Sequence, residues 1–219
     1  MQEINHDFFI EPGINLQNGS NELHTMLNLS KKDIQRRWNT KTGEYILTKW
    51  KANRFYRSIL EGLVGKYYDR IDIRGVSLVG ENLSGVDLRN IDFYSANLED
   101  SVFDGADLTN SWFSEANLKG TKFNWAKMDG VLIDNVDFDH RTNFGGVNIT
   151  TINFTLASLL QDLAVGQQRI QHLEKRHPIL ATFLRLTCDY GRSFSRFLII
   201  CALTIFLFSF IYIFIPNLK

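Results

Sequence analysis

Proline and cysteine are scarce in this chain, and its charges cancel. The three prolines stand at positions 12, 178 and 216, so the stretch between Pro12 and Pro178 keeps every backbone N–H that an extended hydrogen-bonded ladder requires. The two cysteines are too few for a disulfide framework, and Cys201 lies inside an apolar run, so we expect a reduced, intracellular setting. The first residues show no secretory signal pattern.

Signatures of catalysis are also lacking. Gly80 and Gly85 have the spacing of a phosphate-binding loop, but Val86 stands where that loop requires lysine. The five histidines form no metal-ligand grouping, and the serines lack a nucleophile elbow. We therefore assign no catalytic, cofactor-binding or metal-ligating residue, and we do not expect an enzyme.

The net charge of zero hides an uneven distribution. Residues 1–30 form a polar, acidic segment without lysine or arginine, whereas residues 31–70 hold eleven basic and four acidic residues. Residues 71–155 reverse this balance, with thirteen acidic and six basic residues. A basic region therefore precedes an acidic one.

An internal repeat dominates the middle of the chain. An apolar residue recurs at every fifth position, and in most cases a small or β-branched residue stands two positions earlier. A period of five fits neither an α-helix nor a β-strand and indicates a solenoid. The chain must turn a corner every five residues, so that four sides close a coil of about twenty residues and successive coils pair like strands. The apolar centres are Ile73, Leu78, Leu83, Leu88, Phe93, Leu98, Phe103, Leu108, Phe113, Leu118, Phe123, Met128, Ile133 and Phe138.

The spacing of one coil predicts how the core is filled. Phenylalanines stack on phenylalanines in two columns on opposite sides, with leucines between them; the pairs are Phe93 with Phe113 and Phe103 with Phe123. After Phe138 the frame slips by one residue and resumes at Phe144. We interpret the slip as a one-residue bulge at a corner; the alternative is that the coils end at Phe138.

These residues resemble the pentapeptide-repeat family, whose consensus is A(D/N)LXX. The motif appears here as Ala96-Asn97-Leu98, Ala106-Asp107-Leu108 and Ala116-Asn117-Leu118. The resemblance implies a mainly β fold, a right-handed quadrilateral β-helix over residues 71–155, and it says almost nothing about function.

Residues 197–215 form an apolar run without charge. As an α-helix this run would span the roughly 30 Å hydrocarbon core of a bilayer; the alternative is a buried core helix, for which the short solenoid is a poor partner. Arg185, Arg192 and Arg196 precede the run and Lys219 follows it. The positive-inside rule then places the preceding body in the cytoplasm, and we predict a single-pass protein of the bacterial inner membrane.

Helices are expected on both sides of the repeat. Residues 31–70 suggest a basic helical cap that begins at Ser30; the alternatives for its basic face are contact with anionic lipid or with nucleic acid. Residues 156–196 suggest a helical cap over the open end of the coils and a connector, with Pro178 in the first turn of its second helix. The string from Cys188 to Ser193 resembles the connector that precedes the first membrane helix in bacterial pentapeptide-repeat proteins with a two-helix ion-channel module.

Four outward residues are candidates for contact with a partner. Trp112 and Leu132 occupy one outward column, Trp125 holds a corner position that glycine takes elsewhere, and Tyr94 is a further outward aromatic residue. Exposed apolar side chains without a core role indicate an interaction surface; the alternative is that flanking helices shield them.

The function that fits these features is a membrane-anchored binding or scaffold protein, acting as a subunit or regulator of a membrane assembly. Its partner would be a protein, oligomerisation is compatible with the pattern, and binding of nucleic acid is not expected. The alternative is a DNA-mimicking protein that binds a type II topoisomerase, which the acidic repeat suggests.

Overall fold

The computed structural model describes residues 8–17, 28–155, 157–191 and 193–214. The chain divides into two compact units, Met1–Gln167 and Gln168–Lys219. The first unit holds the N-terminal helices, the repeat coils and the beginning of α5 (Ser158–Arg176). The second unit holds the rest of α5 and the helices that follow it.

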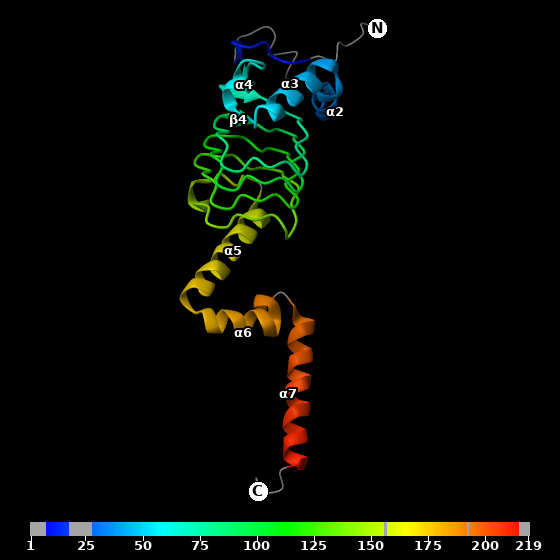
Figure 1. The fold of residues 1–219 in the computed structure, drawn as a ribbon, viewed down its shortest axis with the longest axis vertical. Coiled ribbons are helices and arrows are strands. Elements are labelled where there is room, and N and C mark those ends of the chain that lie inside the picture. Colours follow the sequence, from blue (N-terminus) through cyan, green and yellow to red (C-terminus); the bar gives the residue numbers. More distant parts are fainter. Residues whose placement is uncertain (1–7, 18–27, 156, 192, 215–219) are drawn as a thin grey trace. The chain divides into compact units, whose positions relative to one another are not determined.

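The repeat forms stacked coils whose backbones pair in parallel, drawn in green in Figure 1. Pairing begins where β3 (Arg70–Asp72) lies beside β4 (Ile91–Asp92) and continues as single bridges one coil apart. The bridges fall into four columns, which start at Ser77, Asn82, Asp87 and Asp92. The coil therefore has four sides, as the five-residue period predicts.

Phenylalanine rings fill the core of the coils in two stacks. The ring centroids of Phe93 and Phe113 are 4.8 Å apart, and those of Phe103 and Phe123 are 5.4 Å apart, with interplanar angles of 13° and 12°. The two stacks meet edge to face, because Phe93 and Phe103 are 6.1 Å apart at an angle of 81°. The predicted columns of rings are confirmed.

The frame slip after Phe138 is one inserted residue. The pairing partner of Lys122 is Asn143 and that of Leu132 is Asn153, one residue further along than elsewhere. Thr142 is buried and its hydroxyl donates to the carbonyl of Leu118 at 2.8 Å, which fixes the corner from inside. The predicted bulge is confirmed, and the alternative that the coils end at Phe138 is wrong.

Helices α2 (Lys31–Arg36), α3 (Lys41–Ala52) and α4 (Arg57–Glu61), with the short 3₁₀ helix η1 (Arg37–Asn39), cover the first coil (Figure 1). Helix α2 begins at the predicted cap, since Ser30 Oγ accepts the backbone N–H of Asp33 at 3.2 Å. Trp50 and Leu60 are fully buried in the same apolar cluster as the coil centres. One continuous core thus joins these helices to the repeat.

A short strand in the N-terminal segment was not foreseen from its polar, acidic composition. β1 (Asn15–Leu16) pairs in parallel with β2 (Lys66–Tyr67), which pairs antiparallel with β3. Ile10 and Leu16 are buried against Tyr67. The rest of that predicted segment, residues 1–7 and 18–27, lies outside the described residues.

The first residues of α5 close the far end of the coils. Leu160 and Ala164 are buried in the same core as Phe144. The Gln167 side chain donates to the carbonyl of Thr142 at 2.6 Å and accepts the N–H of Phe144 at 2.8 Å. It therefore satisfies backbone groups of the last coil that would otherwise form an open edge.

In the second unit, α6 (Pro178–Cys188) begins with Pro178 in its first turn, as predicted. It is followed by η3 (Asp189–Gly191) and α7 (Phe194–Phe214). Helix α7 begins at Phe194 rather than at 197, and residue 215 of the predicted span lies outside the described residues. Within Phe194–Ile211, α7 is long and apolar enough to cross a membrane, and none of that stretch is buried.

Two glycines at corners offer a matched test of backbone strain. Gly105 and Gly146 both have positive φ, 68° and 72°, but a Cβ on Gly146 would lie 2.3 Å from Cε3 of Trp125, whereas one on Gly105 meets nothing within 4 Å. We expect Gly105→Ala to lower the free energy of unfolding by about 1–2 kcal/mol through the left-handed backbone. Gly146→Ala should cost about 1 kcal/mol more, because the Trp125 ring must move. Urea unfolding of the full chain in mild detergent measures both, and equal costs would contradict the packing of Trp125 on Gly146.

Candidate functional site

A pocket of about 380 Å³ lies on the side of the coils that carries Asp92, Trp112 and Leu132. Part of its wall comes from the N-terminal segments that cover the first coil. Its lining combines aromatic, apolar and acidic side chains: Leu29, Ile34, Tyr67, Arg74, Asp92, Tyr94, Trp112, Ser114, Glu115, Leu132 and Asp134.

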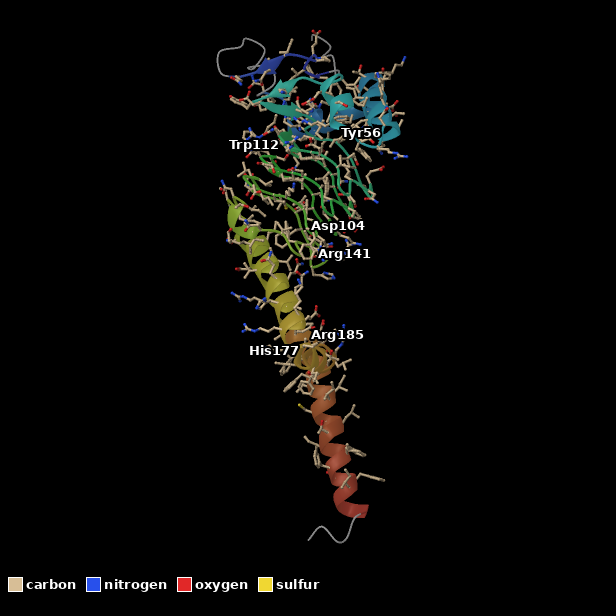
Figure 2. All side chains as sticks on the ribbon, turned by 60° about the vertical axis from the view of Figure 1, so that its left-hand side comes forward. Tyr56, Asp104, Trp112, Arg141, His177 and Arg185 are labelled. Atoms are coloured by element: carbon tan, nitrogen blue, oxygen red, sulfur yellow. The ribbon has the colours of Figure 1, made fainter. Side chains whose placement is uncertain are left out.

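The coil repeat positions most of these residues. Asp92, Trp112 and Leu132 follow one another in a bridged column, and Tyr94 and Asp134 each stand two residues further along their coils. Three of the four predicted contact residues, Tyr94, Trp112 and Leu132, therefore line one pocket. Trp125 is not among the residues that line this pocket. Its neighbour Asn124 donates its backbone N–H to Asp104, and Figure 2 shows Asp104 and Trp112 on different sides of the stack.

A buried cluster of charges supports the floor of the pocket. Arg37, which is fully buried, donates two hydrogen bonds to the carboxylate of Asp72, at 2.8 and 2.9 Å. Arg74 donates to the same carboxylate at 2.8 and 3.2 Å, and Tyr67 covers its guanidinium with the ring centroid 3.8 Å away. Burial alone would raise the pKa of Asp72, but the two guanidinium groups overcome it and hold that pKa well below its ordinary value.

Within this cluster, Asp92 is the acidic residue whose buried carboxyl group has the weakest contacts with positively charged groups. Its side chain is almost fully buried; Oδ1 accepts the backbone N–H of Tyr94 at 2.9 Å, and Oδ2 lies 4.0 Å from Nε of Arg74. Burial raises the pKa of Asp92 to about 7, against the opposing attraction of Arg74. Its carboxyl group therefore changes charge near neutral pH, in contact with the pocket.

Two positively charged side chains of the protein contact residues that line the pocket. The guanidinium of Arg70 lies over the Trp112 ring, 3.7 Å from its centroid. Lys31 Nζ lies 3.6 Å from a carboxylate oxygen of Glu115. The aromatic and acidic walls thus already attract positive charge.

One acceptor in the pocket wall has no partner. Oδ1 of Asp134 is buried and makes no hydrogen bond, a state that costs free energy unless a donor arrives. Among the residues that the structure describes, no group of three His, Cys, Asp or Glu side chains is placed to hold a metal ion.

Sequence reasoning missed the buried charges. Asp72 and Asp92 occupy the position at which Asp or Asn recurs in every coil, where Asp107, for example, accepts the N–H of Thr109 two residues on. Because Asp or Asn is common at this position, the sequence gives no sign that the N-terminal segments bury these two aspartates. The Asp-X-Arg spacing of Asp72 and Arg74 gave no usable signal, because Asp87 and Arg89 repeat it on the exposed surface.

Comparisons with known proteins concern the repeat. A model of the family described as pentapeptide repeats (8 copies) matches residues 70–105, 82–120 and 96–139. No curated protein matches the chain. Solved structures that resemble it include a pentapeptide repeat protein from the thylakoid lumen of Arabidopsis thaliana, which is 26% identical, with 47% of this chain and 77% of that chain covered and a TM-score of 0.21.

Two cyanobacterial structures are also similar. Rfr23 from Cyanothece 51142 is 20% identical, with 38% of this chain and 56% of that chain covered and a TM-score of 0.21. A pentapeptide repeat protein from Nostoc Pcc 7120 is 17% identical, with 51% of this chain and 94% of that chain covered and a TM-score of 0.22. The family match and the coil geometry together identify residues 70–139 as pentapeptide repeats.

Proposed function

We propose that this protein is a membrane-anchored binding module, in which α7 crosses the bilayer and the repeat domain holds a protein partner. The observation that carries the proposal is α7 itself. Its 21 residues span about 32 Å as an α-helix, close to the thickness of the hydrocarbon core. The pocket beside Asp92 supplies a surface suited to recognition.

The exposure of α7 favours lipid over a protein core as its surroundings. Phe206 and Phe208 are 77% and 67% exposed, and none of Phe194–Ile211 is buried. An apolar surface of that extent on a single helix marks an interaction site. Arg185 precedes α7 and Arg196 lies in its first turn, so the positive-inside rule would place the repeat domain in the cytoplasm, at the inner membrane of a bacterium.

The repeat domain supports a role in binding rather than catalysis. Its regular backbone offers a rigid frame, and the pocket brings aromatic and acidic side chains together on one side. Aromatic side chains are enriched where proteins recognise one another. A scaffold held at the membrane, acting as a subunit or regulator of a membrane assembly, is the role that joins these two features.

The alternative, a DNA mimic directed at a type II topoisomerase, rests on the acidic charge of the repeat. Many of its acidic groups are already paired with bases of the same domain. Arg89 binds Asp87, and Arg141 bridges Asp100 and Asp139. Such neutralised columns are a poor imitation of phosphates, which carry one charge for about every 1.7 Å of duplex. Inhibition of gyrase supercoiling by the purified full chain would favour the mimic instead.

The membrane proposal predicts where charge is tolerated. In bacteria producing the full chain, we expect the wild type to stay in carbonate-washed membranes. The double variant Leu203→Lys/Phe206→Lys should leave that fraction or be degraded, because each charge at a span centre costs about 3 kcal/mol on insertion. The control Leu159→Lys, at an exposed position of α5, should behave as the wild type. Release of the wild-type chain by carbonate would contradict the proposal.

A second measurement tests the partner. A photo-crosslinking amino acid in place of Ser114, at the pocket, should give a discrete membrane-dependent adduct with another protein in those cells. The same amino acid in place of Asn135, which is exposed outside the pocket lining, serves as the control. Identical adduct patterns at both positions would contradict a partner at the pocket.

A further inference from the structure

We propose that the pocket beside Asp92 receives the positively charged side chain of an arginine or lysine on the protein partner. This inference rests on the proposed function, since it specifies the chemistry by which the binding module recognises its partner. It commits to an organic cation with N–H donors, carried on a peptide.

The first ground is the supply of acceptors. Oδ1 of Asp134 is buried without a hydrogen-bond partner, and Oδ2 of Asp92 has its nearby cation, Arg74, at 4.0 Å, beyond hydrogen-bonding distance. Both residues line the pocket, as does Glu115. A guanidinium presents five N–H donors and an ammonium three, so either can satisfy several of these oxygens together.

The second ground is that the positive charge of Arg74 is already paired with a carboxylate of the chain. Its guanidinium is bonded to Asp72 and covered by the ring of Tyr67. Arg37 is likewise committed to Asp72. The charges of these two arginines are therefore directed into the floor of the pocket, and they do not turn it into an anion site.

The third ground is the volume of the pocket and the aromatic side chains in its lining. The pocket volume of about 380 Å³ lies at the lower end of small-ligand sites, enough for one long side chain. Tyr94 offers ring surface along which the aliphatic part of arginine or lysine can pack, whereas Tyr67 and Trp112 each already contact a guanidinium of the chain, that of Arg74 or Arg70. Arg70 already uses the Trp112 ring in this way, so the same contact chemistry is present within the chain.

Binding should depend on pH through Asp92. The groups around it are Arg37, Asp72 and Arg74 in the floor, with Arg70, Tyr67, Tyr94, Glu115 and Asp134 around the pocket. Because the pKa of Asp92 is raised to about 7, its carboxyl group is mostly neutral at pH 6 and mostly ionised at pH 8. A permanent cation should therefore bind about three- to tenfold more tightly at pH 8.

The test uses the full chain in mild non-ionic detergent and a defined probe. The probe is acetyl-Gly-Arg-Gly-amide, and its neutral counterpart carries citrulline in place of arginine. Titrations follow the indole N–H signal of Trp112 by nuclear magnetic resonance, assigned with Trp112→Phe. The variant Asp134→Asn removes the negative charge of the carboxylate whose Oδ1 has no partner, and Asp129→Asn, at an exposed position outside the pocket, is its control.

We expect saturable binding of the arginine peptide and about tenfold weaker binding of the citrulline peptide, the ratio that the loss of one charged hydrogen-bonding group produces. Asp134→Asn should weaken binding by a similar factor and Asp129→Asn should not change it. Equal affinity for the two peptides, or a signal that does not saturate, would overturn the inference. If the Ser114 adduct still forms in membranes, the proposed function stands while the cation inference falls; if that adduct is absent and the arginine peptide binds, the reverse holds.

Discussion

Replacing Arg37 by methionine is expected to lower the free energy of unfolding by about 3–5 kcal/mol, the cost of removing one member of a buried group of paired charges. The Arg37 guanidinium is fully buried and holds Asp72 through two hydrogen bonds. It also donates to the carbonyls of Phe8 and Arg74. Methionine fills similar space, but it removes one of the two guanidinium groups that hold Asp72 and takes the Arg37 donor away from the carbonyl of Phe8.

Arg89→Met is the matched control. Arg89 makes the same kind of paired contact with Asp87, at 2.7 and 2.9 Å, but its side chain is 53% exposed. Water replaces the lost donor there, so the expected cost is under about 1 kcal/mol. Urea unfolding of the full chain in detergent, followed by tryptophan fluorescence, compares the two variants. Trp38, whose indole N–H donates to the carbonyl of Arg74 at 2.8 Å, reports directly on this region. Equal costs for the two variants would show that burial does not govern the Arg37 pair.

The coils could be predicted from sequence because their cause is local and repeated. Each apolar centre faces inward for the same steric reason, and an error at one coil would be corrected by the next. The inserted residue near Thr142 was recognisable because the apolar frame shifts by one and then resumes. The caps at Ser30 and Pro178 were equally local signals, each within a few residues of the helix start.

The buried charges could not be predicted, because their environment is set by residues far away in the chain. Arg37 and Asp72 are 35 positions apart, and nothing in the basic segment distinguishes Arg37 from its exposed neighbour Arg36. β1 was missed for the same reason, since its partner Lys66 lies in another segment. From sequence alone, a charged residue is predicted to be exposed to solvent, and only the tertiary structure shows whether a partner buries it.

The pocket could be predicted from sequence only in part. Trp112 and Leu132 were predicted to be neighbours, because the twenty-residue coil puts them in one column, whereas Tyr94 was predicted only as a further outward aromatic residue. Tyr67 and Leu29 were not predicted, since their place depends on how the N-terminal segments fold over the first coil. The repeat thus predicts one wall of the pocket, and the covering segments supply the rest.

Asp92→Asn is expected to stabilise the protein at high pH, in contrast to the usual effect of a buried substitution. The folded-state pKa of Asp92 is about 7, against an ordinary value of 3.8. The folded protein therefore holds a proton on Asp92 that the unfolded chain has released, so stability falls as pH rises between these two values. An ionised Asp92 then costs on the order of 4 kcal/mol at pH 8. Asparagine keeps an oxygen for the N–H of Tyr94 and carries no charge.

The stabilisation by Asp92→Asn should thus be about 3 kcal/mol larger at pH 8 than at pH 5, measured by urea unfolding at both values. Asp87→Asn is the control, because a hydrogen bond from Arg89 lowers the pKa of Asp87, which is ionised in both states throughout that range; its effect should not change between the two pH values. A pH-independent effect of Asp92→Asn would contradict the raised pKa.

A bound cation should favour the ionised carboxylate of Asp92 and recover part of the stability that its ionisation costs. The arginine peptide should therefore raise the stability of the wild type at pH 8 more than that of Asp92→Asn, because linkage joins ligand binding, ionisation and folding.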